Sequence, residues 1–231
     1  NTFDIYNAKR RGTSRDGREI EAEGLTWGDI PASEPPQAKA PRGAISGSRL
    51  PDSGYRAYTF PMKYTVLKAD ITRLSVDAIV NAANSRLAGG GGVDGAIHRA
   101  AGPELSAACR ALIAKIGSLP PGEAVATPAF GIKTARFIIH TVGPSWGVNE
   151  DPDRLLAWCS RASVAAAREK GARTDAFLNI STGVYGFPLD RAAKIVHATL
   201  MAIPDLDRDF DEIVFACFDE ENLALYRALF R

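Results

Sequence analysis

The sequence has few cysteines, almost no net charge and no long apolar run, and each shortage excludes a class of protein. Its three cysteines, Cys109, Cys159 and Cys217, lie far apart without a C-x-x-C spacing, so neither a disulfide framework nor a zinc site is predicted. The formal net charge of +1 gives no general attraction to nucleic acid or membrane surfaces. No apolar run approaches the roughly 18 residues that span a bilayer. The start of the chain has no signal-like apolar core, so we expect a cytoplasmic protein.

The composition changes near residue 61. Residues 1–61 contain six prolines among many small and charged residues, which predicts an irregular N-terminal extension. From Met62 to the end the chain alternates between apolar segments of strand length and amphipathic segments of helix length. We therefore expect one folded domain over residues 62–231.

The alternation within this domain predicts an α/β fold. We expect strands over 64–68, 78–82, 123–128, 136–142, 175–180 and 212–217, and helices over 103–116, 152–170, 189–203 and 220–230. Strands that alternate with helices form a largely parallel sheet between helical layers. Ligands of such sheets bind at the carboxyl ends of the strands.

A glycine-rich stretch follows the strand predicted over 78–82. It reads V-N-A-A-N-S-R-L-A-G-G-G-G-V-D-G-A-I-H from Val80, and a helix is expected to begin near Ala96. The consecutive glycines Gly89, Gly90, Gly91 and Gly92 leave backbone N–H groups open to a ligand. The polar side chains beside them are Asn81, Asn84, Asp94 and His98. The pattern indicates a loop that binds a phosphate group and holds one acid nearby.

Known nucleotide motifs do not explain this loop. Gly90, Gly92 and Gly95 match G-x-G-x-x-G, but they follow the strand by about seven residues and no acidic residue for a ribose follows. No Lys-Ser or Lys-Thr follows either, which excludes the triphosphate loop. A second loop, Ser181-Thr182-Gly183-Val184-Tyr185-Gly186-Phe187-Pro188, also lies between a strand and a helix. Together the two loops favour binding of a diphosphate from both sides.

Several motifs in this order resemble those of the macrodomain family. They are D-I-T from Asp70, V-N-A-A-N-S, G-G-G-G-V-D-G-A-I-H, I-H-T-V-G-P, I-S-T-G-V-Y-G-F-P and the terminal C-F-D-E-E-N. The resemblance runs from about Met62 to Phe230 and is closest to the MacroD-type branch with its bacterial O-acetyl-ADP-ribose deacetylases. It implies a three-layer α/β/α fold with a mixed, mostly parallel sheet, and ADP-ribose as ligand.

The resemblance also implies roles for residues outside the loops. Asp70 would accept a hydrogen bond from the adenine amino group with Ile71 alongside, because a carboxylate is acceptor-only. The alternative is that Asp70 caps the turn before Thr72. Phe218 would lie over the adenine ring, or else be a core residue at a strand end.

Around the distal ribose the resemblance implies Asp94, Asn84 and Tyr185. Asp94 would orient or deprotonate the attacking water. One alternative is that a diphosphate oxygen of the substrate is the base, and another is that Asp94 only caps the next helix. Asn84 would hold ribose hydroxyls in position. His98 lies one helical turn after Asp94 and could adjust the charge or the orientation of the Asp94 carboxylate, or it could be structural. Asn81 is expected at the substrate-binding site, either as support for the loop backbone, which we favour, or as a ribose contact. His140, inside an apolar strand, is interpreted as structural.

The remaining residues expected to bind substrate are the loop members Gly89, Gly90, Gly91, Gly92, Val93, Ser181, Thr182, Gly183, Val184, Tyr185, Gly186 and Phe187. No metal and no cofactor are expected. The predicted function is hydrolysis of ADP-ribose esters, on mono-ADP-ribosylated acidic side chains and on O-acetyl-ADP-ribose. The alternatives are a non-catalytic ADP-ribose reader, an RNA- or poly-ADP-ribose-binding domain and, last, a dehydrogenase. The partners expected are ADP-ribosylated proteins or O-acetyl-ADP-ribose. Binding to a membrane is not expected, and binding to nucleic acid is expected only where the nucleic acid is itself an ADP-ribosylated substrate. The protein is expected to be a monomer.

Overall fold

The computed structural model of the protein describes residues 11–13, 19–21 and 62–230. The chain divides into two compact units, Asn1–Leu50 and Pro51–Arg231. In the first unit, β1 (Arg11–Thr13) and β2 (Glu19–Glu21) form an antiparallel pair. The rest of the predicted extension lies outside the described residues, so the boundary between residues 61 and 62 stays a prediction. Among the described helices, none is long and apolar enough to cross a membrane.

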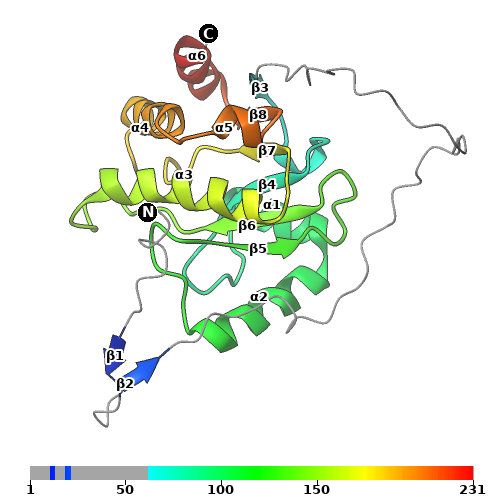
Figure 1. Ribbon diagram of the computed structural model, residues 1–231, viewed down its shortest axis with the longest axis vertical. Coiled ribbons are helices and arrows are strands. Elements are labelled where there is room, and N and C mark those ends of the chain that lie inside the picture. Colours follow the sequence, from blue (N-terminus) through cyan, green and yellow to red (C-terminus); the bar gives the residue numbers. More distant parts are fainter. Residues whose placement is uncertain (1–10, 14–18, 22–61, 231) are drawn as a thin grey trace, which may run out of the picture. The chain divides into compact units, whose positions relative to one another are not determined.

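The second unit is built on a six-stranded sheet. Its strands are β3 (Lys63–Lys68), β4 (Ala78–Ala82), β5 (Ala124–Pro128), β6 (Phe137–Thr141), β7 (Thr174–Phe177) and β8 (Glu212–Cys217). Their order is β3-β8-β7-β4-β6-β5, and Figure 1 shows them in this sequence from β3 to β5. Only the β5–β6 pair is antiparallel. The predicted mixed, mostly parallel sheet is confirmed.

Helices cover the sheet and complete three layers. The helical segments are a 3₁₀ turn at Ile71–Arg73, α1 (Gly92–Ala101), α2 (Pro103–Ile116), α3 (Pro152–Glu169), α4 (Leu189–Met201), α5 (Leu206–Asp209) and α6 (Glu220–Leu229). Helix α1 packs against β4 and α2, and α3 packs against β5, β6 and α4. At the other end of the sheet, α6 contacts β3 and β8 (Figure 1).

Strand β4 shows why the sheet lies between two layers of helices. Ala78, Ile79 and Val80 are all fully buried, although successive side chains of a strand point to opposite faces. A continuous apolar run is what a strand covered on both faces needs. The strand places Asn81 next in line, so a polar side chain also enters the core.

Strand β7 buries a second polar side chain, the carboxylate of Asp175. It is fully buried, and neither of its oxygens forms a hydrogen bond with the described residues. Burial raises the pKa of Asp175 well above its usual value, and the charge of Asp77 raises it further. Between the unfolded and the folded pKa, the folded state therefore holds a proton that the unfolded chain releases.

We expect Asp175→Asn to increase the free energy of unfolding at neutral pH by about 1–3 kcal/mol, because it removes an ionisable group that is buried without partners. Since the folded pKa is raised, the wild type should lose stability as pH rises from about 4 towards that pKa. The variant should lack this part of the pH dependence. Denaturant unfolding of both proteins at pH 5 and pH 8 measures the difference.

Asp211→Asn is a matched control. The exposed Asp211 pairs with Arg173, whose side-chain hydrogen bond lowers the pKa of Asp211, so its removal should not stabilise the protein at neutral pH. Identical pH dependence of unfolding in the wild type and Asp175→Asn would contradict the prediction.

Candidate functional site

Two loops lie at one edge of the sheet because the strands before them are paired. β4 and β7 are adjacent and parallel, with Ala78 opposite Asp175, so their carboxyl ends meet at the same edge. The first loop, residues 83–91, follows β4, and the second, residues 178–188, follows β7. Helix α1 begins at Gly92, and the predicted start near Ala96 is wrong. Asp94 therefore lies in the first turn of a helix and not in the loop.

The first loop exposes its backbone. Gly90, Gly91 and Gly92 are exposed, and a Cβ at Gly91 or Gly92 would meet no atom within 4 Å. Among the described residues, no side chain caps the N-terminus of α1. Its first N–H groups can therefore bind an anion, which the helix dipole favours. Gly95 is required for another reason, since a Cβ there would lie 2.2 Å from the Gly90 carbonyl oxygen.

Asn84 shapes the first loop. Its Nδ2 donates to the Gly89 carbonyl oxygen at 2.8 Å, and its Oδ1 accepts from the N–H groups of Arg86 at 3.1 Å and Ala88 at 3.3 Å. Sequence reasoning expected this amide to hold ribose hydroxyls, and that role stays a prediction. An Asn amide nitrogen carries two hydrogens, and the contact with Gly89 uses one.

The Asp94 carboxylate is buried beside this loop. Its Oδ1 accepts a hydrogen bond from Asn81 Nδ2 at 2.8 Å and lies 3.5 Å from His98 Nε2. Its Oδ2 faces the loop, because a Cβ on Gly90 would lie 3.6 Å from it. Burial raises the pKa of Asp94, and the Asn81 hydrogen bond and the His98 ring work in the opposite direction.

His98 lies between Asp94 and helix α2. Its Nδ1 is 3.2 Å from Ser106 Oγ, so the hydroxyl of α2 holds one ring nitrogen while the other faces the carboxylate. A Cβ on Gly89 would lie 3.3 Å from the ring. His98 therefore separates the first loop from α2, which is compatible with both roles considered for it.

The second loop is held by its own backbone and by the loop after β6. Ser181 is buried with a left-handed φ of 66°, and its carbonyl oxygen accepts from the Phe187 N–H at 3.0 Å. Val184 and Gly183 are exposed. The Phe187 ring is buried and lies 4.8 Å from the Trp146 ring. Of the residues predicted in this loop, Phe187 can therefore offer a ligand only its backbone.

Sequence reasoning did not single out the loop after β6 as a support for the second loop. The Trp146 N–H donates to the Tyr185 carbonyl oxygen at 2.8 Å. A Cβ on Gly143 would lie 2.0 Å from Ser181 Oγ, so only glycine fits there. The G-P-S-W sequence after a strand was the available signal. It places a close backbone approach and an aromatic ring next to the second loop.

Asp70 and Phe218 follow two other adjacent strands, β3 and β8. Asp70 Oδ1 accepts from Thr72 Oγ1 at 2.7 Å and from the Thr72 N–H at 3.0 Å, and the bond from the Thr72 hydroxyl is the largest cause that lowers its pKa. Its carboxylate thus caps the turn, yet its side chain stays about half exposed. Ile71 beside it is buried. The Phe218 ring is 87% exposed, so the alternative that it is a core residue is wrong.

These residues lie along one edge of four parallel strands. β3, β8, β7 and β4 are consecutive in the sheet, and strands are spaced by about 4.8 Å, so β3 and β4 are about 14 Å apart. An exposed ring and a carboxylate lie at one end, and two glycine-containing loops and Asp94 lie at the other. The arrangement suits an elongated ligand with an aromatic base and an anionic centre.

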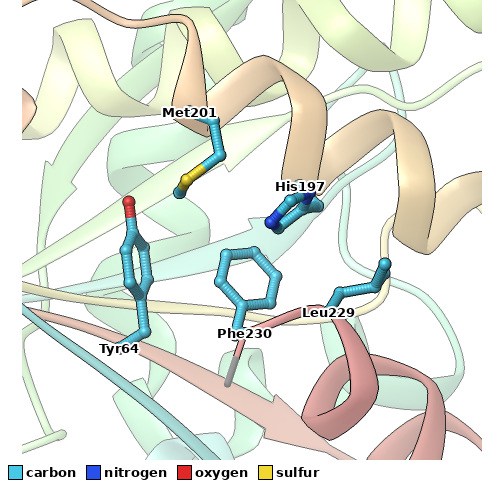
Figure 2. Close-up of a pocket in the computed structure, with 5 residues that line it drawn as sticks. All are labelled: Tyr64, His197, Met201, Leu229 and Phe230. Atoms are coloured by element: carbon cyan, nitrogen blue, oxygen red, sulfur yellow. The ribbon is translucent and has the colours of Figure 1, made fainter.

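A cavity of about 320 Å³ lies elsewhere and contains none of the predicted site residues. Figure 2 shows its lining, which consists of Tyr64, His197, Met201, Leu229 and Phe230. These residues come from β3, α4 and the end of α6. Burial, with the charge of Asp207, raises the pKa of Tyr64 to about 12. The lining is therefore mostly apolar and aromatic.

No group of three or more His, Cys, Asp or Glu side chains that could hold a metal ion occurs in the described ranges. At this edge of the sheet, the candidate chemical groups are the Asp94 carboxylate and the loop backbone.

Comparison with known proteins agrees with this geometry. A family model described as the macro domain matches residues 80–196. A macro domain-containing protein of Ralstonia nicotianae is 56% identical over 161 residues, which are 69% of this chain and 90% of that protein. An O-acetyl-ADP-ribose deacetylase of Klebsiella pneumoniae is 49% identical over 165 residues, 71% of this chain and 94% of that protein.

Solved structures show the same fold. The Oceanobacillus iheyensis macrodomain with ADP has a TM-score of 0.65 and 41% sequence identity, and the match covers 70% of this chain and 86% of that one. The Trypanosoma brucei macrodomain in complex with ADP-ribose has a TM-score of 0.62 and 37% sequence identity, and the match covers 72% of this chain and 68% of that one. The chain belongs to the macro domain family.

Proposed function

We propose that the chain binds ADP-ribose and hydrolyses its esters, both on mono-ADP-ribosylated acidic side chains and in O-acetyl-ADP-ribose. The observation that carries the proposal is Asp94, a buried carboxylate in the first turn of α1 with one oxygen bound by Asn81 and the other beside Gly90. A relative named O-acetyl-ADP-ribose deacetylase and a neighbour in complex with ADP-ribose support the substrate class.

The ligand would lie along the carboxyl ends of the four parallel strands. The adenine ring would stack on Phe218, with its amino group donating to Asp70. The diphosphate would lie between the two loops, bound by backbone N–H groups and by the N-terminus of α1. The distal ribose would then reach Asp94, with Asn84 and Tyr185 beside it.

The chemistry requires an activated water. Asp94 would accept a proton from the water as the water oxygen attacks either the ester carbonyl carbon or ribose C1″. The bond from the attacked carbon to the ester oxygen breaks. In carbonyl attack Asp94 returns the proton to the leaving ribose oxygen, and in attack at C1″ the carboxylate leaves and Asp94 releases the proton to solvent, so that both routes give a carboxylate and ADP-ribose. The raised pKa of Asp94 makes its carboxylate a stronger base than an exposed aspartate. A substrate diphosphate oxygen is the alternative base.

The cytoplasmic location, the monomeric state and the protein partners stay predictions. The residues of the candidate site all come from one chain.

Phe218→Ala should weaken ADP-ribose binding by about 1–3 kcal/mol, because an aromatic ring stacked on a base contributes about this much. Phe218→Tyr should bind within a few fold of wild type, since it keeps the ring. Isothermal calorimetry measures both affinities, and equal thermal unfolding midpoints would show that the exposed position does not affect the fold. Unchanged affinity of Phe218→Ala would place the base elsewhere.

Asp94→Asn should lower kcat for O-acetyl-ADP-ribose and for a mono-ADP-ribosylated protein by about 10²-fold or more, since a positioned base contributes about that factor. ADP-ribose affinity should change far less. Asp205→Asn, at an exposed position with a left-handed φ of 56° that Asn tolerates, is the matched control. If wild type binds ADP-ribose but releases no product, the chain is a reader and the hydrolase proposal is wrong.

The pH dependence of kcat/KM should contain an acid limb set by Asp94. Because burial raises its pKa, activity should fall as pH decreases through a value above the usual 3.9 or so of an aspartate. A series of buffers from pH 4 to pH 9 measures the limb. If Asp94→Asn retains the same limb on its residual activity, the titrating group is another one.

A further inference from the structure

Three polar side chains on neighbouring strands form a buried chain that ends at Asp94. Asn81 of β4 lies opposite His140 of β6 in the parallel register, and Val125 of β5 lies opposite His140 on the other side. Thr127 is two residues after Val125, so its side chain shares this face of the sheet. Asn81, His140 and Thr127 are each at most 1% exposed.

The distances determine the direction of each hydrogen bond. His140 is neutral, because burial lowers its pKa to about 3, so one ring nitrogen carries hydrogen and the other accepts. Asn81 Nδ2 can only donate, and it lies 3.1 Å from His140 Nδ1. Nδ1 is therefore the acceptor. Nε2 then carries the hydrogen and donates to Thr127 Oγ1 at 2.9 Å.

This chain determines which end of the Asn81 amide faces Asp94. Nδ2 donates one hydrogen to His140 and the other to Asp94 Oδ1 at 2.8 Å. A flipped amide would place its oxygen against an ionised carboxylate, which also only accepts. In the described part of the chain, Asn81 Oδ1 forms no hydrogen bond, so no contact of the amide oxygen opposes the orientation that His140 and the carboxylate both favour.

We propose that His140 is a positioning residue for Asp94: by accepting a hydrogen bond from Asn81, it supports the orientation in which the amide donor is directed at the carboxylate, while the His140 Nε2–H is held by Thr127. The inference rests on the proposed function of Asp94. It replaces the interpretation of His140 as merely structural.

Other groups that face Asp94 do not duplicate this role. His98 approaches from the same helix at 3.5 Å, longer than a hydrogen bond, and its second nitrogen is held by Ser106. Cys109 of α2 lies 4.0 Å from His140 Nε2. Burial, together with the charge of Asp94, raises the pKa of the Cys109 thiol to about 12, so it stays neutral. The Asn81 amide is thus the sole hydrogen-bond donor to Asp94 Oδ1 among the described side chains.

The test compares His140→Leu with His140→Asn. Both variants lose the hydrogen bond to Thr127. The Asn side chain keeps an acceptor oxygen bonded to Cγ, at the place of Nδ1 in histidine. The Leu side chain has no acceptor there. We expect His140→Leu to lower kcat about tenfold or more with little change in KM. Its acid limb should move to higher pH, because Asp94 loses an oriented donor that favours its charged form. His140→Asn should recover most of both effects.

Two further variants separate positioning from loss of packing. Ile139→Ala removes buried volume next to His140 in the chain but on the opposite face of the sheet, so it should lower stability without moving the acid limb. Thr127→Val removes the acceptor of the His140 Nε2 hydrogen with little change in volume. It should shift the limb in the same direction as His140→Leu by a smaller amount, and it keeps the test available if His140→Leu does not fold.

A readout that needs no hydrolysis completes the test. NMR titration of ¹³C-labelled Asp carboxyl groups, with Asp94→Asn for assignment, should show a higher Asp94 pKa in His140→Leu than in wild type or His140→Asn. This result in a protein without hydrolase activity would remove the proposed function but keep the positioning role. An unchanged Asp94 titration in His140→Leu and Thr127→Val, or equal shifts in Ile139→Ala, would overturn the inference.

Discussion

The constraint on which the site depends is the cost of burying the Asp94 carboxylate. A charge taken out of water needs hydrogen bonds or opposite charge to remain ionised. Asn81 supplies a hydrogen bond from β4, His98 lies nearby on α1, and the N-terminal end of α1 favours negative charge. Each of these partners is in place only when β4, the first loop and α1 have folded together. The reactive group is therefore a product of the tertiary structure.

The same constraint explains an unusual feature of the core. Strand β4 is apolar through Val80 and then buries Asn81, whose amide would be costly without partners. The neighbouring strands supply side-chain partners for its Nδ2, since His140 and Thr127 continue the hydrogen bonds across β6 and β5. A connected set of buried hydrogen bonds holds one arrangement more firmly than an apolar contact would, because each bond depends on the direction of its donor and acceptor.

Much of this structure follows from local patterns, and the rest depends on contacts that local patterns do not contain. The strand Ala78–Ala82 and the helix Pro103–Ile116 have the bounds that their apolar spacing predicts, and the motif order identifies the fold. The start of α1 was misplaced because four glycines indicate a loop, whereas Gly91 serves as its N-cap. The bond from Asn81 to His140 depends on the register of β4 with β6, which joins residues 59 apart. The exposure of Phe218 likewise depends on how the segment after β8 leaves the sheet.

Binding and chemistry are carried by different parts of this edge of the sheet. The first loop offers backbone N–H groups and positions free of side chains, so affinity for a diphosphate depends on the path of the chain and not on any one functional group. The proposed ester hydrolysis would depend instead on the ionisation and direction of one carboxylate. A small change in the hydrogen bonds behind Asp94 would then alter the rate while the ligand still binds. Under this proposal, buried side chains that never touch the ligand would decide whether this chain reads or removes ADP-ribose.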